Sequence, residues 1–256
     1  MRKAKKNSKN SVVGKLAKIL LYVVAVFFVF TIFITICYRW LNPPITPLMV
    51  IRKVTIDASI NKKWVSIDHI SPSLIDCVVA AEDNNYLVHR GFDFGAIEKA
   101  IDEKKTRGRV RGASTISQQT AKNVFLWQKQ SWVRKGTEVY FTFLIEAFWS
   151  KERIMEVYLN VIEMGKGIYG AEAAAQSYFH RSAKQLTPNQ SALIVAALPS
   201  PLKRNPAKPS EYLSSRAGNI LALSHKIGQI KFDKESIEKA KHNAAKRELQ
   251  SKNKKK

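Results

Sequence analysis

Residues 131–149 read SWVRKGTEVYFTFLIEAFW, and this stretch decides the class of fold. Ser131 is a typical helix N-cap, and the segment from Val139 to Ile145 is apolar around the whole circumference of a helix. That pattern is typical of a central core helix, and the segment is too short to span a bilayer. We therefore predict a core helix over 131–149, in which Glu146 needs a partner that the sequence does not identify.

Further helix signals lie on both sides of this segment, so we predict a mostly α body. Ser71-Pro72 and Thr187-Pro188 each place an N-cap before a proline at the first helical position. The predicted helices cover 71–81, 94–104, 115–127, 131–149, 151–160, 171–179, 187–198, 211–227 and 233–250. Two short strands are predicted at Val54–Asp57 and Trp64–Ile67, where apolar and polar residues alternate.

The N-terminal region predicts one transmembrane helix over 19–38. These twenty residues carry no charge, and at about 1.5 Å per residue a helix of this length spans a hydrocarbon core. Seven Lys or Arg precede the span within residues 1–18, whereas only Arg39 follows closely. The positive-inside rule then places the N-terminus in the cytoplasm and the body outside. A cleaved signal peptide and a buried core helix are the alternatives.

The remaining chain divides by composition into three further segments. The proline-rich stretch from Asn42 to Pro47 lies in an expected linker over 39–53, the main domain is expected over 54–225, and a basic tail over 226–256. The tail carries eleven Lys or Arg and four acids, within a formal charge of +23 for the chain. It either holds the domain against an anionic membrane or is a solvated end. A body outside the cytoplasm makes nucleic acid an unexpected partner.

The two cysteines indicate neither a disulfide nor a metal site. Cys37 lies at the end of the apolar span and Cys77 within a predicted helix, so pairing them would require an improbable geometry. No HExxH or similar ligand cluster occurs.

A first polar cluster follows the helix predicted at 71–81. Glu82 lies four residues after Val78 and seven after Ile75, which places it on the apolar stripe of that helix. A carboxylate on this side is costly unless it is hydrogen-bonded, so Glu82 is a candidate for proton transfer. The alternative is a helix-end carboxylate that turns to solvent. We interpret the nearby His89 as a structural hydrogen-bonding residue.

The second and third clusters combine cations with polar groups. Thr115, Gln119 and Lys122 share one face of a helix whose N-terminus could bind phosphate and sugar oxygens, although a solvated polar face is the alternative. The preceding basic stretch 106–112 is predicted to be a mobile loop. Arg134 and Glu138 are i,i+4 neighbours on a helix, with the arginine before the glutamate. This order stabilises a helix less than the reverse, which mildly favours a role in a site over a stabilising bridge.

Together these clusters resemble the peptidoglycan glycosyltransferases, glycosyltransferase family 51. Five motifs appear in the family's order over about residues 64–206. They are Glu82-Asp83 with Tyr86, His89, Gly91 and Asp93; Gly112-x-Ser114-Thr115-Ile116-x-Gln118-Gln119-x-x-Lys122-Asn123; Arg134-Lys135-x-x-Glu138; Tyr158-Leu159-Asn160 with Gly165, Gly167, Tyr169-Gly170-Ala171 and Ala173-Ala174-Ala175; and Ala197-Leu198-Pro199-Ser200-Pro201 with Asn205-Pro206. Tyr86 stands where the family usually has phenylalanine, so its added hydroxyl needs a hydrogen-bond partner.

The resemblance implies a fold and a reaction. The fold would be a lysozyme-like, two-lobed, mostly α glycosyltransferase domain behind one transmembrane helix. The enzyme would polymerise lipid II into β-1,4 glycan strands, with inversion and release of undecaprenyl diphosphate from the growing chain. Glu82 would be the general base and Glu138 the second essential carboxylate, near the diphosphate. The substrate-binding residues would be Asp83, Tyr86, His89, Ser114, Thr115, Gln118, Gln119, Lys122, Asn123, Arg134 and Lys135.

The resemblance also sets the expected partners and location. No tightly bound cofactor is expected, and a divalent cation, Mg²⁺ or Mn²⁺, is compatible with the substrate diphosphate. Partners would be lipid II, the lipid-linked glycan, the bacterial inner membrane and other wall-synthesis proteins, with the domain in the periplasm. No K-T-G motif occurs and about 50 residues follow Asn205, so we expect no transpeptidase domain. A lysozyme-like hydrolase and a non-catalytic anchored scaffold are the alternative functions.

Overall fold

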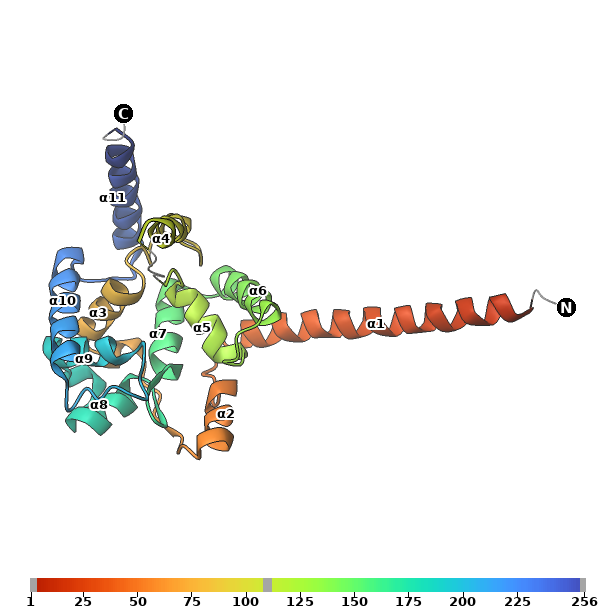
Figure 1. Cartoon of the computed structure of the whole chain (residues 1–256), viewed down its shortest axis with the longest axis horizontal. Helices are drawn as coiled ribbons and strands as arrows, with labels where there is room; N and C mark the ends of the chain where they lie inside the picture. The colour runs from red at the N-terminus through yellow and green to blue at the C-terminus, as the bar shows by residue number, and fades with distance from the viewer. Residues whose placement is uncertain (1–3, 108–111, 254–256) are drawn as a thin grey trace. The chain divides into compact units, whose positions relative to one another are not determined.

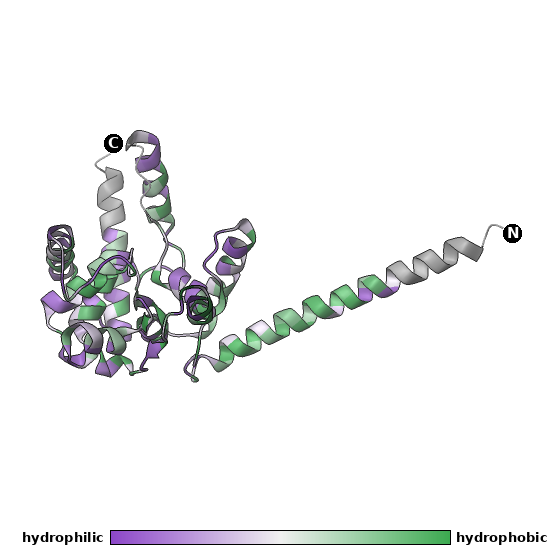
Figure 2. Cartoon of the chain, turned by 60° about the horizontal axis from the view of Figure 1, so that its bottom comes forward, coloured by the Kyte–Doolittle hydropathy of each residue, from purple (hydrophilic) through white to green (hydrophobic). Residues whose placement is uncertain are grey.

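A computed structural model describes residues 4–107 and 112–253, and the chain divides into two compact units, Met1–Leu41 and Asn42–Lys256 (Figure 1). In the first unit, helix α1 covers Ala4–Cys37, and its segment Gly14–Cys37 is long and apolar enough to cross a membrane. Figure 2 shows mainly hydrophobic residues along this segment. The Thr31 hydroxyl donates to Phe27 O (2.9 Å) and the Thr35 hydroxyl to Thr31 O (2.7 Å). The helix therefore satisfies these hydroxyls internally and is compatible with a single-pass membrane anchor.

The second unit consists mainly of helices with a small sheet. Its helices are α2 (Pro47–Ile56), α3 (Pro72–Glu82), α4 (Phe94–Arg107), α5 (Ile116–Phe125), α6 (Trp132–Phe148), α7 (Lys151–Val161), α8 (Ala171–Phe179), α9 (Pro188–Ala197), α10 (Glu211–Ile227) and α11 (Lys234–Asn253), with 3₁₀ turns at Ile67–His69 and Ala183–Gln185. In the sheet, β3 (Ile168–Tyr169) pairs in parallel with β1 (Asn61–Lys62) and antiparallel with β2 (Glu163–Gly165). The prediction of a mostly α body behind one apolar N-terminal helix is confirmed.

The helices pack in two groups. α3, α9 and α10 pack against one another, and α5 packs against both α6 and α7. Their facing side chains form the core, including Val78, Ile116, Ile145, Ile154 and Ile194, each at most 1% exposed. The end of α3 and the start of α5 thus come from different packing groups, and the residues between these elements position the site.

Local cap signals predicted most helix starts correctly. Thr187, Ser131 and Ser150 each accept a backbone N–H from the first turn of the helix that follows. Ser71 occupies the expected N-cap position, yet its hydroxyl accepts no backbone N–H from the helix and donates to Leu186 O instead (3.0 Å). The helix predicted at 233–250 is present as α11, so the basic tail is helical over Lys234–Asn253.

The two predicted strands are wrong. Val54–Ile56 ends helix α2, and Asp57 follows in a left-handed conformation at φ 44°. Residues 64–66 have no regular structure, and Ile67 begins a 3₁₀ turn. Thr46 accepts the N–H of Met49 and Pro47 takes the first helical position, so this cap and the burial of Met49 outweigh the alternating pattern. Most of α2 therefore lies within the range expected as a linker.

The extended stretch 42–46 is fixed to the body. The Lys62 ammonium donates to Pro44 O (3.1 Å) and to Pro43 O, and Arg153 Nη1 donates to Asn42 Oδ1 (3.0 Å). Both cations also lie over the Trp64 ring, 5.4 and 5.3 Å from its centroid. Burial lowers the pKa of Lys62 to about 8. These contacts fix the orientation in which the chain enters the domain.

The turn into α8 requires glycine at position 170. Gly170 has φ 83°, and a Cβ there would lie 2.8 Å from Asn160 O. Asn160 cannot move away easily, because its side-chain amide donates to Val65 O (2.9 Å) and accepts from Val65 N (2.9 Å).

We predict that Gly170→Ala lowers the free energy of unfolding by about 1–3 kcal/mol, because it adds both backbone strain and a steric clash. Gly218→Ala is the matched control, since nothing lies within 4 Å of a Cβ at that site in α10. The control should stabilise the protein by about 0.5–1 kcal/mol through helix propensity. Urea unfolding monitored by tryptophan fluorescence measures both, and equal stabilities of the two variants would contradict the assignment.

Candidate active site

A cavity of about 250 Å³ lies where α3 ends and where α4 and α5 begin. Its wall contains Glu82 and Asp83 from the end of α3, Lys99 from α4, and Ser114 and Thr115 from the segment before α5. Two residues of the first cluster and two of the second therefore meet at one hollow, although more than 30 positions separate the pairs in the chain. The predicted loop at 106–112 falls largely on 108–111, which lie outside the described residues.

The Glu82 carboxylate is oriented by one amide. Gln119 Nε2 donates to Glu82 Oε2 (2.8 Å), and the Tyr158 hydroxyl donates to Gln119 Oε1 (3.3 Å). Burial raises the pKa of Tyr158 well above its ordinary value, and the charges of Glu82 and Asp83 raise it further, so the phenol stays protonated. Tyr158 thereby fixes which end of the Gln119 amide faces Glu82. Within the described residues no hydrogen bond occupies Glu82 Oε1, which belongs to a half-buried side chain on the cavity wall.

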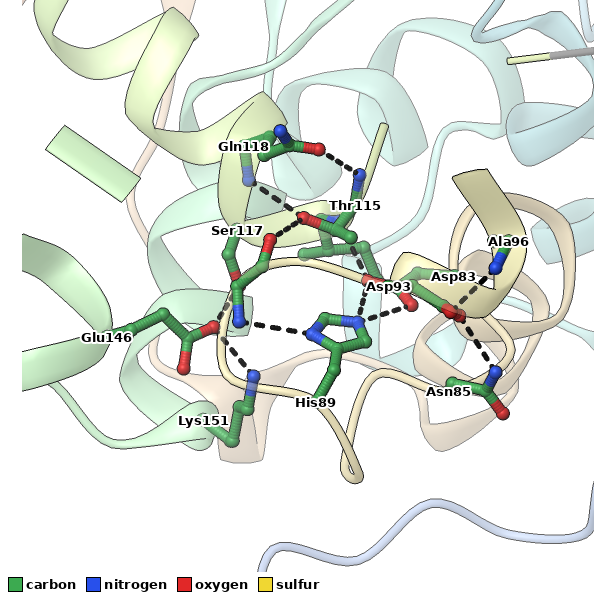
Figure 3. A network of polar contacts seen from close by, with 12 residues as sticks. Asp83, Asn85, His89, Asp93, Ala96, Thr115, Ser117, Gln118, Glu146 and Lys151 are labelled. Carbon is green, nitrogen blue, oxygen red and sulfur yellow. Dashed lines mark hydrogen bonds and ion pairs between the residues drawn. The ribbon is translucent and has the colours of Figure 1, made fainter. Parts of the chain in front are cut away.

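Asp83, which lines the cavity, connects three segments of the chain (Figure 3). His89 Nε2 lies 2.8 Å from Asp83 Oδ1, and Ile116 N donates to Asp83 Oδ2 (2.9 Å). Gly91 N donates to His89 Nδ1 (3.1 Å), so Nδ1 accepts and Nε2 carries the proton. His89 therefore makes structural hydrogen bonds, in agreement with its interpretation from sequence.

Thr115 and Gln118 form the N-terminal cap of α5. Thr115 Oγ1 accepts from Gln118 N (3.2 Å) and donates to Gly91 O (2.7 Å), while Thr115 N donates to Gln118 Oε1 (3.0 Å). Both side chains are buried, at 3% and 5% exposure. The Thr115 hydroxyl is thus occupied by the capping box and does not form a free polar face with Gln119 and Lys122. A direct contact of Thr115 or Gln118 with substrate stays a prediction.

The third cluster is a buried carboxylate held by cations. Arg134 Nη1 lies 2.6 Å from Glu138 Oε2, and Lys135 Nζ contacts Glu138 Oε1. Arg134 and Glu138 do form an ion pair, so the unfavourable residue order did not prevent the bridge. The Lys122 ammonium is nearby: burial lowers its pKa, the charge of Glu138 opposes this, and the charges of Arg134 and Lys135 add to it. Three cations and one carboxylate leave an excess of two positive charges here.

Two of these cations border a second, more open hollow of about 550 Å³. Arg134, Lys135 and Ser114 line it, and Ser114 also lines the Glu82 cavity. Arg134 Nε is buried and has no hydrogen-bond partner among the described residues, 4–107 and 112–253. Asn123, a further predicted residue, donates to Gln119 O (2.8 Å) within α5 and is buried. The arrangement can deprotonate a hydroxyl at one hollow and neutralise an anion at the other.

The partner of Glu146 is Lys151, which the sequence did not identify. Lys151 Nζ lies 2.6 Å from Glu146 Oε1, to which the Ser117 hydroxyl also donates (Figure 3). The ammonium stands 4.8 Å from the centroid of the Tyr86 ring, and the Tyr86 hydroxyl donates to Lys151 O (2.6 Å). The hydroxyl added at position 86 therefore has its expected partner. The sequence feature that could have indicated this pair is the N-cap at Ser150. It starts α7 at Lys151, directly after the end of α6.

The described residues hold no group of three or more His, Cys, Asp or Glu side chains that could bind a metal ion. Both oxygens of Glu138 contact cations, so this carboxylate offers no open ligand set. The residues present therefore do not fit a metal site built from protein ligands.

The sequence is similar to known proteins over most of its length. Residues 49–225 match the family model described as Transglycosylase. A biosynthetic peptidoglycan transglycosylase of Bacteroides thetaiotaomicron is 57% identical over 219 residues, which are 83% of this chain and 88% of the relative. A protein of the same description from Bdellovibrio bacteriovorus is 53% identical over 80% of this chain and 84% of its own length. Another, from Caulobacter vibrioides, is 56% identical over 72% of this chain and 80% of its own length.

We predict that Lys151→Met lowers the free energy of unfolding by about 3–5 kcal/mol, because it leaves the Glu146 carboxylate buried without its cation. The Glu146 side chain is 9% exposed. Adding Glu146→Gln to this variant should restore part of the loss. Lys241→Met is the matched control, since it breaks an exposed pair with Glu238 and should change stability little. Chemical denaturation of all three variants measures the difference, and a Lys151→Met protein as stable as the control would refute the assignment.

Proposed function

This chain belongs to the transglycosylase family and polymerises peptidoglycan glycan strands, and on that premise we propose that Glu82 is its general base. The observation that carries the proposal is the hydrogen bonding of the Glu82 carboxylate. One oxygen accepts from Gln119, and the side chain lines a cavity with no hydrogen bond to the other oxygen within the described residues. A base held in one orientation, with a lone pair directed at bound substrate, is what proton abstraction requires.

The proposed reaction joins two lipid-linked sugars. The 4-hydroxyl of the acceptor, lipid II, loses its proton to Glu82 as its oxygen attacks the anomeric carbon of the glycan donor. The new glycosidic bond forms on the face opposite the diphosphate, so the configuration inverts. The bond to the diphosphate breaks, and its electron pair leaves on the phosphate oxygen of undecaprenyl diphosphate. Gln119, oriented by Tyr158, keeps Glu82 aligned with the acceptor.

The second hollow is assigned to the donor diphosphate. A diphosphate leaving group needs charge stabilisation more than it needs a proton. Arg134 and Lys135 line the hollow, and Lys122 lies close enough to both to add its charge. Glu138 holds Arg134 and Lys135 in place and partly balances their charge. A divalent cation would arrive bound to the diphosphate, because the described residues offer no metal-ligand cluster. No step of the proposed mechanism requires it.

The anchor fits a substrate confined to a membrane. We infer that α1 crosses the bacterial inner membrane once, with its basic N-terminus in the cytoplasm and the catalytic unit in the periplasm. The distribution of Lys and Arg around the span supports this orientation. The hydrolase alternative is not favoured, because the relatives are described as biosynthetic enzymes.

We predict that Glu82→Gln lowers the rate of lipid II polymerisation by at least about 10²-fold, because the amide cannot accept the proton. Glu98→Gln is the matched control, an exposed carboxylate on α4. The measurement separates labelled polymer from labelled lipid II after incubation with detergent-solubilised full-length protein. Circular dichroism should show that both variants remain folded. Activity of Glu82→Gln above a tenth of wild type would reject Glu82 as the base.

We predict that Lys122→Ala and Arg134→Ala each weaken moenomycin, the family's mimic of the diphosphate-sugar donor, by about 10- to 100-fold, because each removes a charged hydrogen-bond donor. Lys129→Ala, an exposed lysine nearby, is the control. Burial lowers the pKa of Lys122, so its charge is present at low pH and is lost on the alkaline side before that of an ordinary lysine. Calorimetry should therefore show wild-type affinity falling as pH rises, and Lys122→Arg retaining it to higher pH. Unchanged affinity in both alanine variants would contradict the placement.

A further inference from the structure

A third cavity, of about 550 Å³, has no part in the mechanism above. It lies between the turn after α3 and the helices α10 and α11. Its polar lining includes Asn84 and Asn85 from the turn, Lys226 from the end of α10, Lys231 from the connection, and Lys239 and Asn243 from α11. Apolar side chains such as Val79 and Leu223 form part of its floor. The cavity therefore combines an apolar base with cationic and amide groups.

The charged side chains that line this cavity are all positive. Its lining contains three lysines and no Asp or Glu. None of the three lysines forms a salt bridge with the described side chains of 14–106 and 112–246, although Asp233, which is not part of the lining, is close enough to Lys231 to interact with its charge. Lys241 on the same helix pairs with Glu238 away from the cavity. Ammonium groups in a lining that contains no acidic side chain are suited to bind carboxylates.

The wall that carries these lysines is fixed by specific contacts. Ile230 N donates to Asp76 Oδ1 (2.8 Å), which ties the connection between α10 and α11 to α3. Gly228 ends α10 at φ 86°, with its N–H donating to Ser224 O (2.9 Å), and Asp233 accepts from Ser236 N (2.8 Å) at the start of α11. The connection that carries Lys231 is thus held against α3, and it forms one wall of the cavity.

The cavity shares a wall with the active site. Asn84 and Asn85 line both this cavity and the one that contains Glu82. The cationic hollow at Arg134 and Lys135 shares neither residue. A ligand group that reaches the lysine cavity therefore belongs to the molecule bound at Glu82, which is the acceptor and not the donor.

We propose that this cavity binds the carboxylates of the peptide carried by the acceptor substrate. The proposal rests on the proposed function, since it assumes a peptidoglycan precursor with its reacting hydroxyl at Glu82. Such a precursor carries a peptide with free carboxylates, which complement three lysines that have no acidic neighbours in the lining. The cavity acts in binding only and touches no reacting atom.

The test compares two triple variants with the same change of charge. The cavity variant is Lys226→Ala, Lys231→Ala and Lys239→Ala, and the control is Lys234→Ala, Lys241→Ala and Lys246→Ala, which removes lysines of α11 that do not line the cavity. Each full-length protein is assayed with lipid II bearing free peptide carboxylates and with lipid II whose carboxylates are amidated. The cavity variant should raise KM for the free-carboxylate acceptor roughly tenfold and leave kcat within about twofold.

The proposal predicts two further results. The wild type should show a similar KM rise with amidated lipid II, and the cavity variant should not discriminate between the two substrates. A KM that is unchanged in the cavity variant, or raised equally for both substrates, overturns the proposal. Equal losses in both triple variants that appear only on vesicles containing anionic lipid would show that the tail binds the membrane surface instead. Failure of the proposed function is separate, because Glu82→Gln would then keep its activity.

Discussion

The Asp83 carboxylate is the contact on which the site depends, because it joins the two groups of helices at the cavity. One oxygen accepts from the first backbone N–H of α5, and the other contacts the protonated nitrogen of His89. A carboxylate at a helix N-terminus is also favoured by the helix dipole. The contact fixes the end of α3 relative to α5, and so fixes the distance between Glu82 and its partner Gln119. Without it, the base and the residue that orients it would belong to independently packed helices.

The two essential carboxylates proposed here differ in their surroundings, and the difference separates their roles. Glu82 receives one neutral amide hydrogen bond and is half-buried at a cavity. Glu138 is 3% exposed and has a cation on each oxygen. The first carboxylate has an oxygen open to a substrate hydroxyl, whereas both oxygens of the second are occupied by cations. Ser114 lines both hollows, which brings the positions proposed for acceptor and donor side by side.

The electrostatics of the chain also divide by location. The cations beside Glu138 are partly buried and paired, the lysines of the α10–α11 cavity have no acidic partner there, and those of the N-terminus precede an apolar helix. These three groups would act on a diphosphate, on peptide carboxylates and on membrane orientation, respectively. No single role therefore explains the net charge of +23. The role of each group of cations follows from the residues that surround it.

Local signals in the sequence determined most of the helices and the apolar N-terminal helix. Thr187-Pro188 and Ser150 act within one helical turn, and the hydropathy of 19–38 needs no other part of the chain. Tertiary structure decided the partner of Glu146, the use of the Thr115 hydroxyl at Gly91, and the helix at Pro47–Ile56 where alternation predicted a strand. Sequence patterns report propensity along the chain, whereas these features depend on which distant groups burial brings together.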